Sequence, residues 1–184
     1  MDSSDEPAAV RRIATDPDAL EAFYRRHIDD VSRFVARRVP DPHAAADVTA
    51  EVFLQVIAGA ARYRGGPGGA RGWLFGIARN VAAAQGRQAV RERAKGSRIS
   101  GRRLLDADDI ARAEERIDAA RRAAALGPDL AALPEGERAV LELVAYDGLT
   151  VAEAAAALGI RPGTARVRLH RARAAFPAIL EVSP

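Results

Sequence analysis

The amino-acid sequence predicts an all-α protein made of two small helical domains joined by a flexible linker. Alanine, arginine, leucine and glutamate dominate its 184 residues, and no run of alternating β-branched residues is long enough to form a strand. Glycine- and proline-containing breaks separate stretches in which apolar residues recur at helical spacing. We expect helices over residues 17–38, 42–62, 71–91, 107–126, 135–146, 150–158 and 162–176.

Two segments interrupt this series of helices and divide it into units. The segment YRGGPGGARG at residues 63–72 has five glycines and a proline, too many for a helix interior, so we expect a loop there. Residues 92–128 are first basic and then rich in alanine and charge, with little to bury, which is typical of a linker. The sequence therefore predicts an N-terminal domain over 10–91 and a C-terminal domain over 129–180, each a helical bundle.

Helix ends in the N-terminal half are marked by short local signals. Asp16-Pro17 and Asp41-Pro42 each pair an acidic N-cap with a first-turn proline, because proline lacks the N–H that would have no partner there. Farther along the chain, Gly148 is expected to end another helix.

The segment DVTAEVFLQVI at residues 47–57 carries two contrasting stripes. We expect the stripe formed by Val48, Val52 and Val56 to be buried. The other stripe is polar and consists of Asp47, Glu51 and Gln55, and Phe53 and Leu54 flank this polar stripe. Two acids on one ridge could dock a basic partner. From the residues alone, a solvated helix face is the favoured interpretation.

The segment WLFGIARNVAAAQGR at residues 73–87 begins with the single tryptophan of the chain. Trp73, Ile77 and Val81 share one face, which favours core packing for Trp73. Asn80 offers a donor and an acceptor next to a basic loop, which suits hydrogen bonds to the edge of an unstacked base. A single-strand channel would draw on nearby arginines: Arg62, Arg64, Arg71, Arg79, Arg87, Arg91 and Arg93.

Residues 150–176 have the signature of a helix-turn-helix. Thr150 and Glu153 form a capping box, Gly159 supplies the tight turn, and Pro162 opens the second helix. On that helix Ala165, Leu169, Ala172 and Phe176 fall on one stripe. The opposite side carries Gly163, Val167, His170 and Arg171, flanked by Arg166 and Arg173. These features together favour docking in a major groove over a merely solvated basic face.

Charge is distributed unevenly around a net value of +3. Residues 1–60 carry 7 basic and 11 acidic side chains, residues 61–104 carry 11 and 1, and residues 127–160 carry 1 and 6. The basic segments predict contacts with a polyanion. We also hypothesise that the free protein closes on itself through attraction between residues 127–160 and 61–104.

Several classes of protein are disfavoured by what the sequence lacks. It has no cysteine for disulfides or thiolate metal sites, no apolar run near the ~20 residues of a membrane span, and an acidic N-terminus unlike a secretory signal. His27, His43 and His170 are scattered without metal-ligand spacing, and no phosphate loop or catalytic nucleophile is recognisable. We expect a cytoplasmic protein that is not an enzyme and needs no metal or cofactor. His27 and His43 are interpreted as surface or helix-end residues.

Three blocks carry a family resemblance: DVTAEVFLQVI at 47–57, WLFGIARN at 73–80 and LPEGERAVLELVAYDGLTVAEAAAALGIRPGTARVRLHRAR at 133–173. With these blocks the chain resembles bacterial RNA polymerase sigma factors of the sigma-70 family, in the extracytoplasmic-function (ECF) subfamily. The resemblance implies a transcription initiation factor that directs core RNA polymerase to promoters. Its partners would be the β′ clamp helices and β flap of the polymerase, promoter DNA and an anti-sigma factor.

The resemblance also implies roles for individual residues. The set expected to bind the polymerase is Asp47, Glu51, Phe53, Leu54 and Gln55. The set expected to bind and melt the minus-ten element is Tyr63, Arg64, Arg71, Trp73, Arg79, Asn80 and Arg87. The set expected to read the minus-thirty-five element as duplex is Thr164, Arg166, Val167, His170, Arg171 and Arg173.

An alternative interpretation is a helix-turn-helix regulator that binds duplex DNA without acting as a polymerase subunit. It explains residues 133–176 equally well. It leaves the WLFGIARN block without a role.

Overall fold

The computed structural model describes residues 6–94, 130 and 132–175. Over these residues the chain contains helices and no strand, which confirms the all-α prediction. The helices are α1 (Glu6–Arg12), α2 (Pro17–Ala36), α3 (Pro42–Ala60), α4 (Gly69–Ala94), α7 (Glu135–Ala145), α8 (Val151–Ala157) and α9 (Pro162–Ala175). The helix expected over 107–126, the linker beyond residue 94 and Phe176 lie outside the described residues.

The local signals read from the sequence form the expected helix ends. Asp16 accepts hydrogen bonds from the backbone N–H groups of Asp18 and Ala19, and Asp41 accepts one from Ala44 at 2.7 Å. Gly148 adopts φ +63° after α7. These contacts satisfy backbone groups that a helix leaves without partners at its ends.

The predicted loop over 63–72 is partly wrong, because α4 already begins at Gly69. Two physical reasons account for the glycines there. Gly69 has φ +57°, a conformation that side chains with a Cβ avoid. Gly72 lies inside the helix, where a Cβ would come within 3.0 Å of the Ala156 Cβ on α8. Close packing, rather than loop formation, therefore explains the last glycines of this segment.

Helices α1 to α4 enclose an apolar core. Fully buried side chains from three helices fill it: Val31, Phe34 and Val35 from α2, Val52 and Val56 from α3, and Leu74 and Phe75 from α4. The rings of Phe34 and Phe75 meet edge to face with their centroids 5.3 Å apart, a favourable arrangement for aromatic pairs. The predicted apolar stripe of α3 is confirmed as buried.

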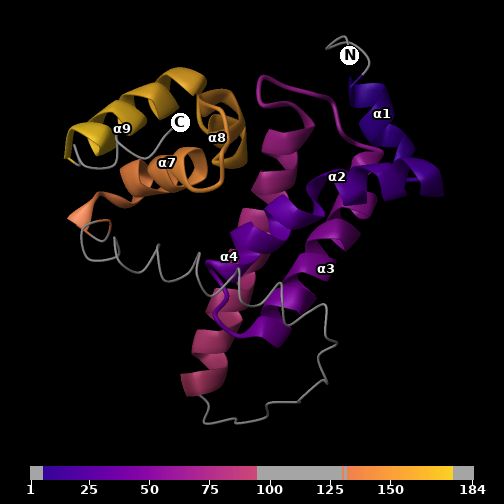
Figure 1. Cartoon of the computed structure of the whole chain (residues 1–184), viewed down its shortest axis with the longest axis horizontal. Helices are drawn as coiled ribbons and strands as arrows, with labels where there is room; N and C mark the ends of the chain where they lie inside the picture. Colours follow the sequence, from indigo (N-terminus) through magenta and orange to yellow (C-terminus); the bar gives the residue numbers. More distant parts are fainter. Residues whose placement is uncertain (1–5, 95–129, 131, 176–184) are drawn as a thin grey trace.

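Helices α7, α8 and α9 form a second cluster (Figure 1). The capping box at Thr150 and Glu153 is present, and Gly159 adopts φ +65° in the turn between α8 and α9. On α9, Ala165, Leu169 and Ala172 are buried against α7 and α8, as predicted. These residues form the expected helix-turn-helix.

The two groups of helices pack against each other through α4 and α8, which lie side by side in Figure 1. Leu143, Leu149, Ala154 and Ala157 belong to the same apolar cluster as the core of α1 to α4. Glycines of α4 face α8 at this contact, so the two helix backbones come close together. In the described part of the chain the two groups of helices are therefore in contact with each other. We call this contact the closed arrangement.

Candidate functional site

The outward side of α9 is a continuous exposed surface. All six residues of the predicted minus-thirty-five set are exposed on it: Thr164, Arg166, Val167, His170, Arg171 and Arg173. Arg168 differs, because it lies over α7, where a Cβ on Gly136 would come within 2.9 Å of its guanidinium carbon. The buried stripe of small residues fixes α9 to its neighbours and leaves the basic side open.

Part of the predicted minus-ten set shares one face of α4. Trp73, Asn80 and Arg87 are spaced seven residues apart, which offsets each from the next by only about 20° around the helix. Asn80 and Arg87 are exposed, and Trp73 is half-buried against Tyr63 with the ring centroids 5.0 Å apart. Arg64, in the preceding loop, is also exposed.

Arg71 lies on a different face of α4, and its guanidinium is already bonded to other parts of the protein. Its guanidinium donates to the backbone carbonyls of Gly148 at 2.7 Å and Asp147 at 3.1 Å, and it pairs with Asp30 at 3.1 Å and Glu153 at 3.4 Å. These bonds join α4 to the turn between α7 and α8.

Arg79 and Tyr63 also differ from the exposed members of the minus-ten set. Arg79 lines a cavity of about 140 Å³ together with Arg38, Arg138 and Glu142. Tyr63 is buried, and burial raises the pKa of its hydroxyl to about 12. The structure therefore divides the predicted minus-ten set between an exposed face, the contact with α7 and α8, and, for Tyr63, the apolar core.

The predicted polymerase set on α3 forms a polar ridge with one exception. Asp47, Glu51, Leu54 and Gln55 are exposed, and the Gln55 amide donates to the Glu51 carboxylate at 2.8 Å. Phe53 is instead buried and adds no exposed apolar surface beside this ridge. The reason is its position on the α2 side of α3, where it packs against Tyr24 with the ring centroids 4.7 Å apart.

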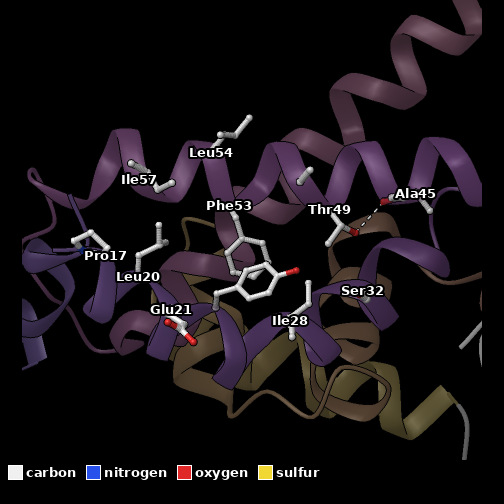
Figure 2. A pocket seen from close by; sticks show the side chains of 13 residues that line it. Pro17, Leu20, Glu21, Ile28, Ser32, Ala45, Thr49, Phe53, Leu54 and Ile57 are labelled. Atoms are coloured by element: carbon white, nitrogen blue, oxygen red, sulfur yellow. Dashed lines mark hydrogen bonds between the residues drawn. The ribbon is translucent and has the colours of Figure 1, made fainter. Parts of the chain in front are cut away.

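Beside this ridge, α2 and α3 leave an apolar groove of about 570 Å³. Figure 2 shows Phe53, Leu54 and Ile57 on one side and Leu20 and Ile28 on the other. Sequence reasoning missed the contribution of α2. The signal was present, since Leu20, Tyr24 and Ile28 recur every four residues and so share a face.

Two arginines that directly follow α2 complete the contact between the two groups of helices. The carboxylate of Asp147 has no exposed side-chain surface and pairs with Arg37 and Arg38. Glu142 lies 3.4 Å from Arg38. Burial lowers the pKa of Arg38 to about 10, so its guanidinium stays charged at neutral pH.

These pairs bear on the hypothesis of self-closure from charge. Acidic residues of 127–160 do contact basic ones, but only Arg71 among these partners comes from the segment 61–104. The other partners, Arg37 and Arg38, directly follow α2 and lie outside the segment 61–104.

His27 is not the surface residue that the sequence analysis predicted. It is buried within α2, with its ring centroid 4.6 Å from that of Phe23. Burial, followed by the charge of Arg26, lowers the pKa of His27. Among the described residues, no group of histidines and acids could hold a metal ion. No helix in that part of the chain is long and apolar enough to span a membrane.

Comparison with known proteins identifies the family of this chain. A model of sigma-70 region 2 matches residues 23–92, and one of sigma-70 region 4 matches residues 130–176. The ECF RNA polymerase sigma factor SigC of Mycobacterium tuberculosis is 38% identical over 164 residues, covering 89% of this chain and 84% of its own. The chain belongs to the ECF subfamily of sigma-70 sigma factors. Sigma factors associate with RNA polymerase, so this chain is a polymerase-associated transcription factor.

Solved structures share the fold of this sigma factor. CnrH, in complex with the cytosolic domain of CnrY, matches over all of both chains with a TM-score of 0.63 and 22% identity. The sigma factor RpoE of Bartonella quintana, in complex with the anti-sigma factor NepR, matches 89% of this chain and 99% of its own, with a TM-score of 0.53 and 22% identity.

Proposed function

We propose that this sigma factor binds core RNA polymerase and directs it to specific promoters, where it melts the minus-ten element and reads the minus-thirty-five element. Residues 10–91 would form the region 2 domain, 92–128 the linker and 129–180 the region 4 domain. One observation supports the proposal most directly. The segment that matches region 2 exposes a polar face of α4 that suits single-stranded DNA, and the segment that matches region 4 exposes the basic side of α9, which suits duplex DNA.

Polymerase docking is assigned to α3 and the adjoining groove. Asp47 and Glu51 supply negative charge for a basic partner, while Leu54 supplies exposed apolar area, with 59% of its surface accessible. The groove beside them can receive apolar side chains. Specific interfaces usually combine charged residues, which guide the encounter of the two proteins, with apolar residues that become buried on binding. The β′ clamp helices are the proposed occupant, and the β flap would contact the region 4 domain.

Minus-ten recognition is assigned to the exposed face of α4 and the loop before it. The Asn80 amide can both donate to and accept from the edge of one base, and the half-buried ring of Trp73, which packs against Tyr63, provides aromatic surface on the same face of α4. Capturing an extruded base offsets the cost of unstacking, a few kcal/mol per base. Arg64 and Arg87 would contact the phosphates of the opened strand.

Minus-thirty-five recognition is assigned to α9, placed in the major groove of duplex DNA. Its 14 residues are about 21 Å long, enough to cross several base pairs. Arg166 and Arg171 can bond the O6 and N7 atoms of guanine, with His170 beside them. In this proposal Thr164 and Arg173 contact phosphates, and Val167 contacts a thymine methyl group.

The closed arrangement cannot hold both promoter elements at once. As their names imply, the elements are centred about 25 base pairs apart, which is roughly 85 Å of B-form DNA. Helices α4 and α9 both contact α8, and packed helices lie about 8–10 Å apart, so the two DNA-reading helices are within roughly 20 Å of each other. We propose that α8 leaves α4 before promoter binding, which also releases Arg71 and Arg79 for DNA.

A protein regulator is proposed as a further partner of this sigma factor. RpoE, which shares its fold, has been solved with the anti-sigma factor NepR. The sigma factor and its polymerase would act together in the cytoplasm.

The proposal is tested with core RNA polymerase from the source organism and its genomic DNA. The full chain is added, and transcript 5′ ends are mapped with and without it. We expect chain-dependent start sites that share two upstream motifs. A protein that binds duplex DNA specifically yet neither binds core polymerase nor changes the start sites would be a helix-turn-helix regulator instead.

A further inference from the structure

Helix α1 contacts both ends of the glycine-rich loop that precedes α4. At the start of the loop, Arg11 Nη1 donates to the backbone carbonyl of Tyr63 at 3.3 Å. At its end, the backbone N–H of Ala70 donates to Glu6 Oε1 at 2.6 Å. Two residues of one short helix therefore hold the two ends of this loop.

The middle of the loop is fitted to α1 as well. Gly65 adopts φ +77°, and a Cβ there would come within 3.0 Å of the Pro7 Cγ. Gly69 adopts φ +57°, and a Cβ there would come within 2.8 Å of Glu6 Oε1. Gly65 and Gly69 thus meet α1 at distances that leave no room for a side chain.

The core anchors α1, so these contacts have a fixed base. Val10 and Ile13 are each only 3% exposed and belong to the apolar cluster of α2 to α4. A loop so rich in glycine has many conformations to lose when it becomes ordered. Glu6 also satisfies a backbone N–H in the first turn of α4, where a negative charge is favoured by the helix dipole.

We infer that α1 holds residues 63–70, the loop and the first two residues of α4, in the conformation that receives single-stranded DNA, with Glu6 and Arg11 as positioning residues. This inference rests on the proposed function, because the loop carries Arg64 and leads into the face with Trp73 and Asn80. DNA affinity is reduced in proportion to the fraction of molecules whose loop is in the competent conformation. Loosening α1 should therefore weaken minus-ten binding without touching DNA directly.

Two pairs of variants separate positioning from simple charge effects. Glu6→Ala and Glu6→Gln both remove the negative charge, but glutamine keeps an oxygen that can accept from Ala70. Arg11→Ala and Arg12→Ala both remove one positive charge, but Arg12 pairs with Asp16 on the surface rather than with the loop. The probe is a fluorescein-labelled single strand with the minus-ten non-template sequence of one mapped promoter.

We expect Glu6→Ala to bind this strand about fivefold more weakly than Glu6→Gln, which corresponds to the loss of one capping hydrogen bond. We also expect Arg11→Ala to bind it more weakly than Arg12→Ala. Affinity for core polymerase and for the minus-thirty-five duplex should be unchanged in all four variants. Equal affinities within both pairs would overturn the inference.

Amide hydrogen exchange gives a readout that needs no DNA. Exchange over residues 63–70 should be faster in Glu6→Ala than in Glu6→Gln, while α9 exchanges at the same rate in both. If the unaltered protein fails to bind the strand, the minus-ten assignment is wrong. The ordering of the loop by α1 is then decided by exchange alone, and equal exchange rates would refute it.

Discussion

Arg38 and Asp147 are 109 residues apart in the sequence, yet Arg38 Nη2 lies 3.2 Å from Asp147 Oδ2. Arg37 pairs with the other oxygen of the same carboxylate. Asp147 follows α7, and the two arginines follow α2, so this one carboxylate links the two groups of helices. Its side chain has no exposed surface, which makes the link sensitive to the loss of charge.

We expect Asp147→Asn to open the closed arrangement, because it leaves two arginines without their shared partner. Removing one member of a buried ion pair costs about 3 kcal/mol. The chain has no cysteine, so Ala58→Cys and Ala174→Cys provide two exposed labelling sites for distance measurement by energy transfer. The distance should increase in Asp147→Asn and stay unchanged in Glu21→Gln, which alters a surface pair within α2.

Gly68→Ala should separate the same helices by overpacking. A Cβ on Gly68 would come within 2.3 Å of the Ala156 Cβ and 2.9 Å of the Ala152 carbonyl oxygen on α8. Overpacking of this kind typically costs about 1–3 kcal/mol. Gly66→Ala is the matched control, since a Cβ there meets nothing within 4 Å.

The same pair of labels reports this change. A longer distance in Gly68→Ala than in Gly66→Ala is the expected outcome. Identical distances would mean that α8 does not rest on α4 in solution.

Stability should fall in acid through His27. Burial lowers the pKa of His27 below its usual 6.5, so the folded protein binds fewer protons there than the unfolded chain does. Its contribution is complete above pH 6.5 and is lost as the pH falls from 6.5 toward the lowered pKa. The free energy of urea unfolding should therefore drop less between pH 7.5 and 5 in His27→Gln than in the unaltered protein. His43→Gln, in the first turn of α3, is the control, and an identical drop in all three proteins would contradict the assignment.

Much of the fold was predictable because it depends on local signals. The caps at Asp16 and Asp41, the turn at Gly159 and the buried stripe of α9 follow from residues close together in the sequence. Such features need only a helix period and the hydrogen bonds of a helix end.

The remaining features depend on contacts between distant segments. Gly72 is a glycine inside a helix because α8 approaches it closely, and His27 is buried because α2 packs among its neighbours. Arg71 and Asn80 look alike in sequence as polar residues of one basic segment, but only Arg71 meets the turn at Gly148. No local pattern in the sequence separates these two residues, because the difference depends on a segment far away in the chain.

Asn80→Ala and Arg171→Ala should fail in opposite ways, because they alter helices that read different forms of DNA. Arg171→Ala should weaken binding to the minus-thirty-five duplex about tenfold, the cost of one good base contact. Its opening of a promoter, followed by permanganate reactivity at saturating protein, should be nearly normal. Asn80→Ala should bind the duplex normally and open it poorly. Arg168→Ala controls for lost charge, since Arg168 lies on the same helix but rests against Gly136. If Asn80→Ala and Arg171→Ala weaken duplex binding equally and leave opening intact, the two helices do not divide promoter recognition between them.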